Sequence, residues 1–269
     1  MTASKQIIDQ SSETNLSFRH RQAFTLIELL VVITIIGILA ALLTVVIGAV
    51  MRRANETVIQ TELNQITAAV EFYKTEYQAG YPPSTTARLK THVRNIFPRA
   101  TQADIDSIPN NLTPAEILWF VLRGYTSDPY QPVQFANTIV KRKTSFEMKP
   151  DRILPGPTGA FIYVPQGGQD VPYVYFDVSR TTPPYTAAEY TYTHPIGGVA
   201  HPYKTPDRVD PSIFVYADAG KYQIISAGLD GLYGNNSFEK IYPLGDNYNE
   251  QDDDNLVNFS GSNLGDSKP

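Results

Sequence analysis

The chain has 269 residues, enough for one good-sized domain with an appendage, and a composition typical of a folded protein, 42% hydrophobic and 18% charged. A net charge of -5 argues against a general nucleic-acid-binding surface, so we expect no nucleic-acid partner. The absence of cysteine excludes disulfides, thiolate metal sites and cysteine nucleophiles. The 20 prolines and 17 glycines predict many turns and few long helices beyond the N-terminal region.

The N-terminal region contains a run of 23 residues, 29–51, without a charged side chain. As a helix this run is about 34 Å long, enough to cross the hydrocarbon core of a bilayer. Positive charge at residues 19–21 predicts a cytoplasmic N-terminus and an exported remainder, although two arginines at 52–53 reduce the asymmetry. The run is long for a secretory signal peptide and lacks a small-residue cleavage site after it. Hydropathy alone therefore indicates a membrane anchor.

Glu28 distinguishes this segment from a plain anchor, because a carboxylate at the edge of an apolar helix is costly without a partner. Residues 23–32, AFTLIELLVV, resemble the cleavage and methylation motif of type IV pilins and type II secretion pseudopilins. The resemblance implies that a prepilin peptidase cuts between Ala23 and Phe24 and methylates the new N-terminus. It also implies that Glu28 pairs with the N-terminal amine of a neighbouring subunit, a buried pair that sets the stagger between subunits.

The same resemblance implies a structural filament subunit, not an enzyme, in the inner membrane of a bacterium. Its N-terminus is cytoplasmic before cleavage, and its globular domain is periplasmic or lies in an extracytoplasmic filament. The implied partners are subunits of a homo- or hetero-filament, the prepilin peptidase and the inner-membrane assembly platform. Two positions depart from the family: Ala23 stands where Gly is usual, and Val45 stands where many members have a helix-loosening Pro.

A second helical pattern follows the apolar run. Apolar residues recur at spacings of 4, 3, 4, 3 and 4 and form one stripe: Ile59, Leu63, Ile66, Val70, Tyr73 and Tyr77. This predicts a helix packed on its own domain, in preference to a separate coiled coil, until the Gly-Tyr-Pro-Pro sequence at 80–83 ends it. The predicted organisation is a leader at 1–23, a transmembrane half of a spine helix at 24–51, an amphipathic half at 52–79 and a globular domain at 80–269.

The predicted fold class is α+β, with the spine helix packed on a small antiparallel β-sheet domain with long loops. The middle of the chain is longer than in a typical pseudopilin, so residues 85–160 are interpreted as an insertion. Within it, Thr113 as N-cap, Pro114 and Glu116 predict a capping box and a helix that ends at Gly124. Apolar residues cover most of this helix and predict that it is buried or forms an interface.

Short strands are predicted after this helix from runs rich in β-branched and aromatic residues, at 160–164, 173–178, 213–216 and 222–226. The last two runs are separated by a short turn that contains Gly220, which predicts a β-hairpin. A loop rich in Tyr, Pro and Thr, residues 183–206, lies between the second run and the third.

The C-terminal region is acidic between Asp230 and Asp254, with seven carboxylates and one basic side chain, Lys240. A solvated surface is the simpler interpretation of such a run. However, Ser226 to Gly231 is a tight turn directly after a predicted strand. Together with a returning Asp triplet, this turn could supply the six to eight oxygens that calcium prefers.

This turn resembles the calcium loop of the major pseudopilin of type II secretion, which has a similar Ser-x-Gly-x-Asp-Gly turn followed by a pair of Asp. The resemblance implies a Ca2+ site whose ligands are Ser226, Asp230, Asp252 and Asp253, with Asp254 as the substitute if the register shifts by one. About twenty residues separate Gly231 from Asp252, more than the few that are usual in the family.

Two other functions stay open beside the filament subunit. The first is a surface-binding module that uses the pilin leader only for display, with the aromatic loop from Tyr185 to Tyr203 in contact with a glycan or another surface. The second is a membrane-anchored hydrolase that uses the acidic loop. The sequence has no nucleophile-elbow, phosphate-loop or dinucleotide motif to support a hydrolase, and nothing near the acidic loop suggests an apolar pocket for an acid pair.

Overall fold

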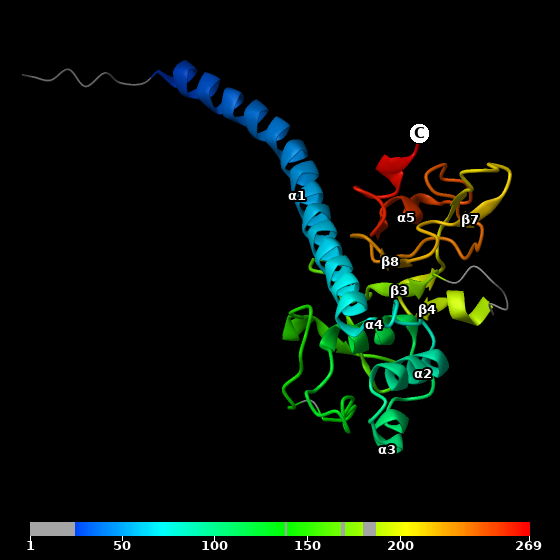
Figure 1. Cartoon of the computed structure of the whole chain (residues 1–269). Coiled ribbons are helices and arrows are strands. Elements are labelled where there is room, and N and C mark those ends of the chain that lie inside the picture. The colour runs from blue at the N-terminus through cyan, green and yellow to red at the C-terminus, as the bar shows by residue number, and fades with distance from the viewer. Residues whose placement is uncertain (1–24, 138, 168–169, 180–186) are drawn as a thin grey trace, which may run out of the picture. The chain divides into compact units, whose positions relative to one another are not determined.

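The computed structural model describes residues 25–137, 139–167, 170–179 and 187–269 (Figure 1). The chain forms two compact units, Met1–Gly48 and Ala49–Pro269. One helix, α1 (Leu26–Tyr77), contributes its first turns to the first unit and the rest to the second. The predicted α+β class is confirmed, since short helices and antiparallel strands follow this long N-terminal helix.

The first half of α1 is apolar on every side, because the sequence places no charged residue between positions 29 and 51. Its large apolar side chains are between 44% and 82% exposed. The hydroxyls of Thr34 and Thr44 donate to carbonyl oxygens one turn earlier in the helix, at 2.6 and 2.8 Å, so neither hydroxyl needs water. Within the described residues, α1 alone is long and apolar enough to cross a membrane.

The second half of α1 has one buried face, as the spacing of its apolar residues predicts. These side chains are at most 3% exposed: Ile59, Leu63, Ile66, Ala69, Val70 and Tyr73. The helix ends at Tyr77, and Gly80 follows with a φ of 78°, which glycine adopts without steric cost. The prediction that this half packs on its own domain is therefore confirmed.

Three helices follow: α2 (Thr86–Ile96), α3 (Gln102–Asp106) and α4 (Pro114–Arg123). Helix α4 begins as predicted, because the Thr113 hydroxyl accepts the N–H of Glu116 while the Glu116 carboxylate accepts the N–H of Thr113 at 2.8 Å. It ends at Gly124, whose φ is 73° and where a Cβ would lie 2.0 Å from the carbonyl oxygen of Lys143. Every residue of α4 is buried, so the prediction of a buried helix is confirmed.

The strands are short and antiparallel. A central sheet has three strands in the order β3 (Val174–Asp177), β8 (Tyr222–Ser226) and β9 (Leu256–Val257). The other strands form pairs, namely β1 (Ile153–Pro155) with β2 (Phe161–Tyr163), β4 (Tyr192–His194) with β5 (Gly198–Ala200), and β6 (Lys204–Pro206) with β7 (Phe214–Tyr216). Short helical turns lie before, between or after them: η1 (Pro150–Arg152), η2 (Ala187–Tyr190), α5 (Glu250–Asp253) and η3 (Gly265–Ser267).

The central sheet is buried on both faces. Successive side chains of a strand point to opposite faces, so Tyr175 of β3 and Ile224 of β8 share one core with the buried stripe of α1 and with α4. The alternate residues Val174, Phe176 and Ile225 belong to a second core. That core includes residues of β4, β5 and the C-terminal segment. Burial on both faces explains why no residue of β3 or β8 is exposed.

The predicted β-hairpin of residues 213–216 and 222–226 is wrong. Strand β7 pairs with β6, whereas β8 pairs with β3 on one edge and with β9 on the other. The buried Gln223 side chain of β8 donates to the carbonyl oxygens of Tyr203 and Ala217, both at 2.8 Å. Two neighbouring runs joined by a turn favour pairing with each other. However, β8 is buried on both faces, and its central place between β3 and β9 pairs its backbone on both edges.

A partly buried ion pair connects α1 to the strands. The guanidinium of Arg152, in η1, contacts both carboxylate oxygens of Glu62 on α1, with Nη1 at 2.8 Å from Oε2. The hydroxyls of Tyr163 and Tyr173 donate to the same carboxylate at 2.9 and 2.8 Å. Burial raises the pKa of Tyr173 well above its usual range, and the charge of Glu62 raises it further, so the hydroxyl remains a donor. These donors compensate the carboxylate for the water it loses.

The buried stripe of α1 can be tested by truncating one side chain on it. We expect Leu63→Ala, at a fully buried position, to lower the free energy of unfolding by about 2–5 kcal/mol, because it leaves a cavity. Val58→Ala, on the same helix but 41% exposed, should cost about 0.5 kcal/mol or less. Urea unfolding of the detergent-solubilised chain measures both. Equal losses would contradict this packing.

Candidate functional site

Glu28 lies in the first turn of α1, and among the described residues its side chain hydrogen-bonds to Thr25. The Oε2 atom of Glu28 accepts hydrogen bonds from the backbone N–H and from the hydroxyl of Thr25, both at 2.8 Å. The Thr25 hydroxyl in turn accepts the N–H of Glu28 at 3.2 Å, which makes a capping box. The positive end of the helix macrodipole also favours a carboxylate at this position. The carboxylate is thus held at the start of the apolar half of the helix.

Sequence analysis misses the role of Thr25, although a Thr-x-x-Glu spacing before an apolar run is the signal of a capping box. Ala23 and Phe24, the predicted cleavage and methylation positions, lie outside the described residues. No ion pair with Glu28 is found in the part of the chain that the structure describes. The charge of Glu28 therefore has local hydrogen bonds there but no counter-charge.

Two of the five predicted calcium ligands meet at the turn after β8. The Asp254 carboxylate accepts the N–H groups of Leu229 and Asp230 at 2.5 and 2.9 Å and so closes this turn. Gly228 has a φ of 64°, and a Cβ there would collide with Asp254. The Asp230 carboxylate accepts the N–H of Leu232 at 2.8 Å. Burial raises the pKa of Asp230, and the nearby charge of Asp254 raises it further, while the bond from Leu232 opposes both.

The other three predicted ligands have different surroundings. Asp252 is the third residue of α5, where its carboxylate accepts the N–H of the N-cap Asn249, and it forms a buried ion pair with Lys240, with 2.6 Å between Oδ1 and Nζ. Asp253 pairs with Lys268 at 2.5 Å, and both of these side chains are about one third exposed. Ser226 is fully buried at the end of β8, and its hydroxyl has no hydrogen-bond partner among the described residues.

The aspartates among the predicted ligands, including Asp254 as the substitute, have separate partners in this structure. A calcium ion needs six to eight oxygens around one point, whereas each of the four aspartates already accepts an internal donor or pairs with a lysine. Over the ranges that the structure describes, no group of three or more His, Asp or Glu side chains is arranged to hold a metal ion. Calcium binding stays a prediction that rests on the sequence resemblance.

Three tyrosines of the aromatic loop in the display hypothesis are buried. Tyr190, Tyr192 and Tyr203 are at most 4% exposed and belong to the second core, on one face of the central sheet. Tyr185, where the predicted loop begins, lies outside the described residues. The three buried tyrosines stabilise the domain and are not accessible to a glycan.

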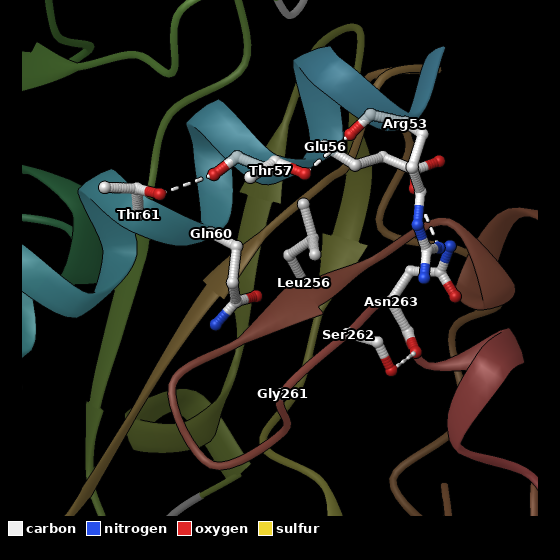
Figure 2. Close-up of a pocket in the computed structure, with 9 residues that line it drawn as sticks. All are labelled: Arg53, Glu56, Thr57, Gln60, Thr61, Leu256, Gly261, Ser262 and Asn263. Carbon is white, nitrogen blue, oxygen red and sulfur yellow. Dashed lines mark hydrogen bonds and ion pairs between the residues drawn. The ribbon is translucent and has the colours of Figure 1, made fainter. Parts of the chain in front are cut away.

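A small pocket lies between the second half of α1 and the C-terminal segment (Figure 2). Gln60 donates to the carbonyl oxygen of Ser260 at 3.2 Å, and Arg53 pairs with Asp266 at 2.5 Å. The pocket holds about 130 Å³, less than the volume of a small-molecule site. Its lining comes from one face of α1 and from the C-terminal segment: Arg53, Glu56, Thr57, Gln60, Thr61, Leu256, Gly261, Ser262 and Asn263. We interpret it as a packing seam that holds the end of the chain against the helix.

Comparison with known proteins identifies the N-terminal segment. Residues 18–44 match the model of the prokaryotic N-terminal methylation motif. The chain is 47% identical over 81 residues to the type IV wide pilus major component PilA4 of Thermus thermophilus, a match that covers 29% of this chain and 62% of that protein. It is 38% identical over 76 residues to the type II secretion system core protein G of Pseudomonas aeruginosa, covering 28% of this chain and 52% of that protein.

The chain spans between half and two thirds of the length of these curated relatives. Its N-terminal segment carries the prepilin-type methylation motif, and over this segment the chain is similar to type IV pilins and type II secretion pseudopilins. The resemblance predicted from residues 23–32 is thereby confirmed. No solved structure is significantly similar to the chain.

The acidic loop predicts that its neighbouring aspartates Asp253 and Asp254 contribute unequally to the free energy of unfolding. We expect Asp254→Ala to cost about 1–3 kcal/mol of unfolding free energy, because two N–H groups of the turn lose their acceptor. Asp253→Ala removes only a partly exposed ion pair and should cost about 1 kcal/mol or less. Chemical denaturation without added calcium measures both variants. If Asp253→Ala were the more damaging, this view of the turn would be wrong.

Proposed function

We propose that the chain is a structural subunit of an extracytoplasmic filament, either a type II secretion pseudopilus or a related type IV filament, and that it has no enzymatic activity. Residues 1–23 are removed by a prepilin peptidase, and Phe24 becomes the methylated N-terminus. The first half of α1 anchors the subunit in the bacterial inner membrane before assembly. The globular domain lies on the extracytoplasmic side, and the partners are other filament subunits and the inner-membrane assembly platform.

The N-terminal segment supports this proposal. The methylation motif covers residues 18–44, and both curated relatives are named as components of a pilus or of a secretion system. The large apolar side chains of the first half of α1 are exposed among the described residues, and lipid or the same helix of other subunits would cover them. A helix that is apolar all round suits both surroundings in turn, first the membrane and then a filament interior.

The single observation that carries the proposal is the position of Glu28. The carboxylate stands at the start of an apolar helix, five residues into the chain that cleavage before Phe24 would leave. Lipid or packed apolar helices around this charge would make it costly without a cation. The amine that cleavage creates on a neighbouring subunit is a cation at the same end of the same helix. Pairing the two would compensate both charges and align the subunits along the filament.

Processing can be tested on the purified protein. In cells that produce a prepilin peptidase, we expect mass spectrometry of the N-terminal peptide to find a chain that begins at Phe24 and carries one added methyl group. The same chain from cells without the peptidase should keep the leader. A chain that keeps residue 1 in the presence of the peptidase would contradict the proposal.

The role of the Glu28 charge can be separated from its role as a helix cap. Glu28→Gln keeps an oxygen that can accept the Thr25 bonds but has no charge. Thr25→Ala removes the two hydrogen bonds of the Thr25 hydroxyl, leaves the backbone N–H bond and keeps the charge. We expect Glu28→Gln to lower the yield of filaments sheared from cells by at least about tenfold, the effect of about 1.4 kcal/mol per added subunit. Thr25→Ala should assemble with a yield close to that of the unchanged chain.

Both variants should be processed and reach the membrane in normal amounts, which immunoblotting of membrane fractions checks. If Glu28→Gln assembled normally while Thr25→Ala did not, the carboxylate would act as a helix cap and not as an assembly charge.

A further inference from the structure

Lys240 and Asp252 form the most deeply buried of the ion pairs found among the described residues. Their side chains are 1% and 0% exposed, and 2.6 Å separates Nζ from Oδ1. The comparable pair of Arg152 and Glu62 is 8% and 12% exposed. Charges without water need other polar groups around them, so the surroundings of this pair show what it does.

The carboxylate is surrounded by donors. Its second oxygen, Oδ2, accepts the backbone N–H groups of Asn235 and Asn249, at 3.1 and 2.9 Å. Gly234, beside Asn235, has a φ of 83°, and a Cβ there would lie between 2.2 and 2.4 Å from the carboxyl group of Asp252. The backbone of residues 234–235 is therefore folded directly around this carboxylate.

The ammonium group is surrounded by acceptors. Lys240 Nζ donates to the carbonyl oxygen of Tyr233 at 2.9 Å and lies 5.6 Å from the centroid of the Tyr203 ring. The same carbonyl oxygen accepts a hydrogen bond from Asn255 Nδ2 at 3.2 Å. One cation therefore draws together three separate parts of the C-terminal region: the turn at 233–235, the N-terminus of α5 and the segment that contains Lys240.

The lysine is held in place by its own backbone. The carbonyl oxygen of Lys240 accepts the N–H of Lys204, at the start of β6, at 2.9 Å. The carbonyl oxygen of Lys204 accepts the N–H of Tyr242 at 2.7 Å. Two backbone hydrogen bonds thus fix the segment on both sides of residue 241. Because the backbone is already ordered there, placing the Lys240 side chain next to Asp252 costs little additional conformational entropy of the loop.

We propose that the ammonium group of Lys240 is the structural cation of this loop, in the place of the calcium ion that the sequence resemblance predicts. The loop between Gly231 and Asp252 is about twenty residues long, and Lys240 lies in its middle. The additional length turns back onto β6 and carries a cation of its own to Asp252. An ammonium group has three donors and one charge, which suit one carboxylate and one carbonyl oxygen.

This proposal concerns the fold of the domain and does not depend on the filament proposal. It states that the loop folds without a divalent ion, whereas the sequence resemblance expects an ion to stabilise it. The two expectations are opposite, so a single set of unfolding measurements separates them.

The experiment uses the full-length chain in detergent micelles. Thermal unfolding is recorded with a chelator, with no addition and with millimolar calcium. We expect the three midpoints of the unchanged chain to agree within about 1 °C. Lys240→Met should unfold about 10 °C lower, because it leaves a buried carboxylate without its cation. Lys221→Met is the matched control, since the side chains of its ion pair with Asp218 are 54% and 28% exposed, and it should shift the midpoint by about 2 °C or less.

A double-mutant cycle completes the test. Asp252→Asn keeps an acceptor for the N–H groups of Asn235 and Asn249 but removes the charge. We expect the double variant Lys240→Met/Asp252→Asn to lose clearly less than the sum of the two single losses, because neither charge is then left alone. Additive losses would overturn the proposal. A chelator that lowers the midpoint of the unchanged chain by several degrees would also overturn it, and that result needs no variant to fold.

Discussion

The 52 residues of α1 form one continuous helix that has to suit two surroundings, and the rest of the structure depends on this constraint. A helix satisfies its backbone hydrogen bonds internally, so one helix can continue from an apolar medium into a protein core without unpaired backbone polar groups. The change occurs in the side chains alone: an uncharged first half gives way to a second half with one buried stripe. The apolar first half suits lipid or packed apolar helices, and the buried stripe of the second half forms part of the domain core.

The globular domain is organised around that second half. The three-stranded sheet of β3, β8 and β9 places one face against the α1 stripe and the other against a core of aromatic and aliphatic side chains. Glu62 then joins the helix to η1 and the strands through a network of Arg152, Tyr163 and Tyr173. A force on the helix would therefore act on the domain through these contacts, which suits the filament subunit that we propose.

Local patterns predict those parts of the structure whose interactions are local. The stripe of α1, the capping box at Thr113 and the end of α4 at Gly124 follow from spacing and from single residue types. The hairpin prediction fails because β8 takes both partners from distant parts of the chain. The ion pair of Lys240 and Asp252 is likewise not predictable from the sequence, which shows Lys240 only as the single basic residue of an acidic loop. Both the pairing of β8 and this ion pair depend on burial and on residues distant in the sequence, which a local pattern does not contain.

The most direct test of the central claim is a helical reconstruction by electron cryomicroscopy of filaments formed by the mature chain. The account predicts that the first halves of α1 pack together in the filament interior. It also predicts that the carboxylate of Glu28 lies within about 4 Å of the N-terminal nitrogen of a neighbouring Phe24. A map in which Glu28 contacts only Thr25 of its own chain, with no amine of a neighbour in reach, would contradict the account.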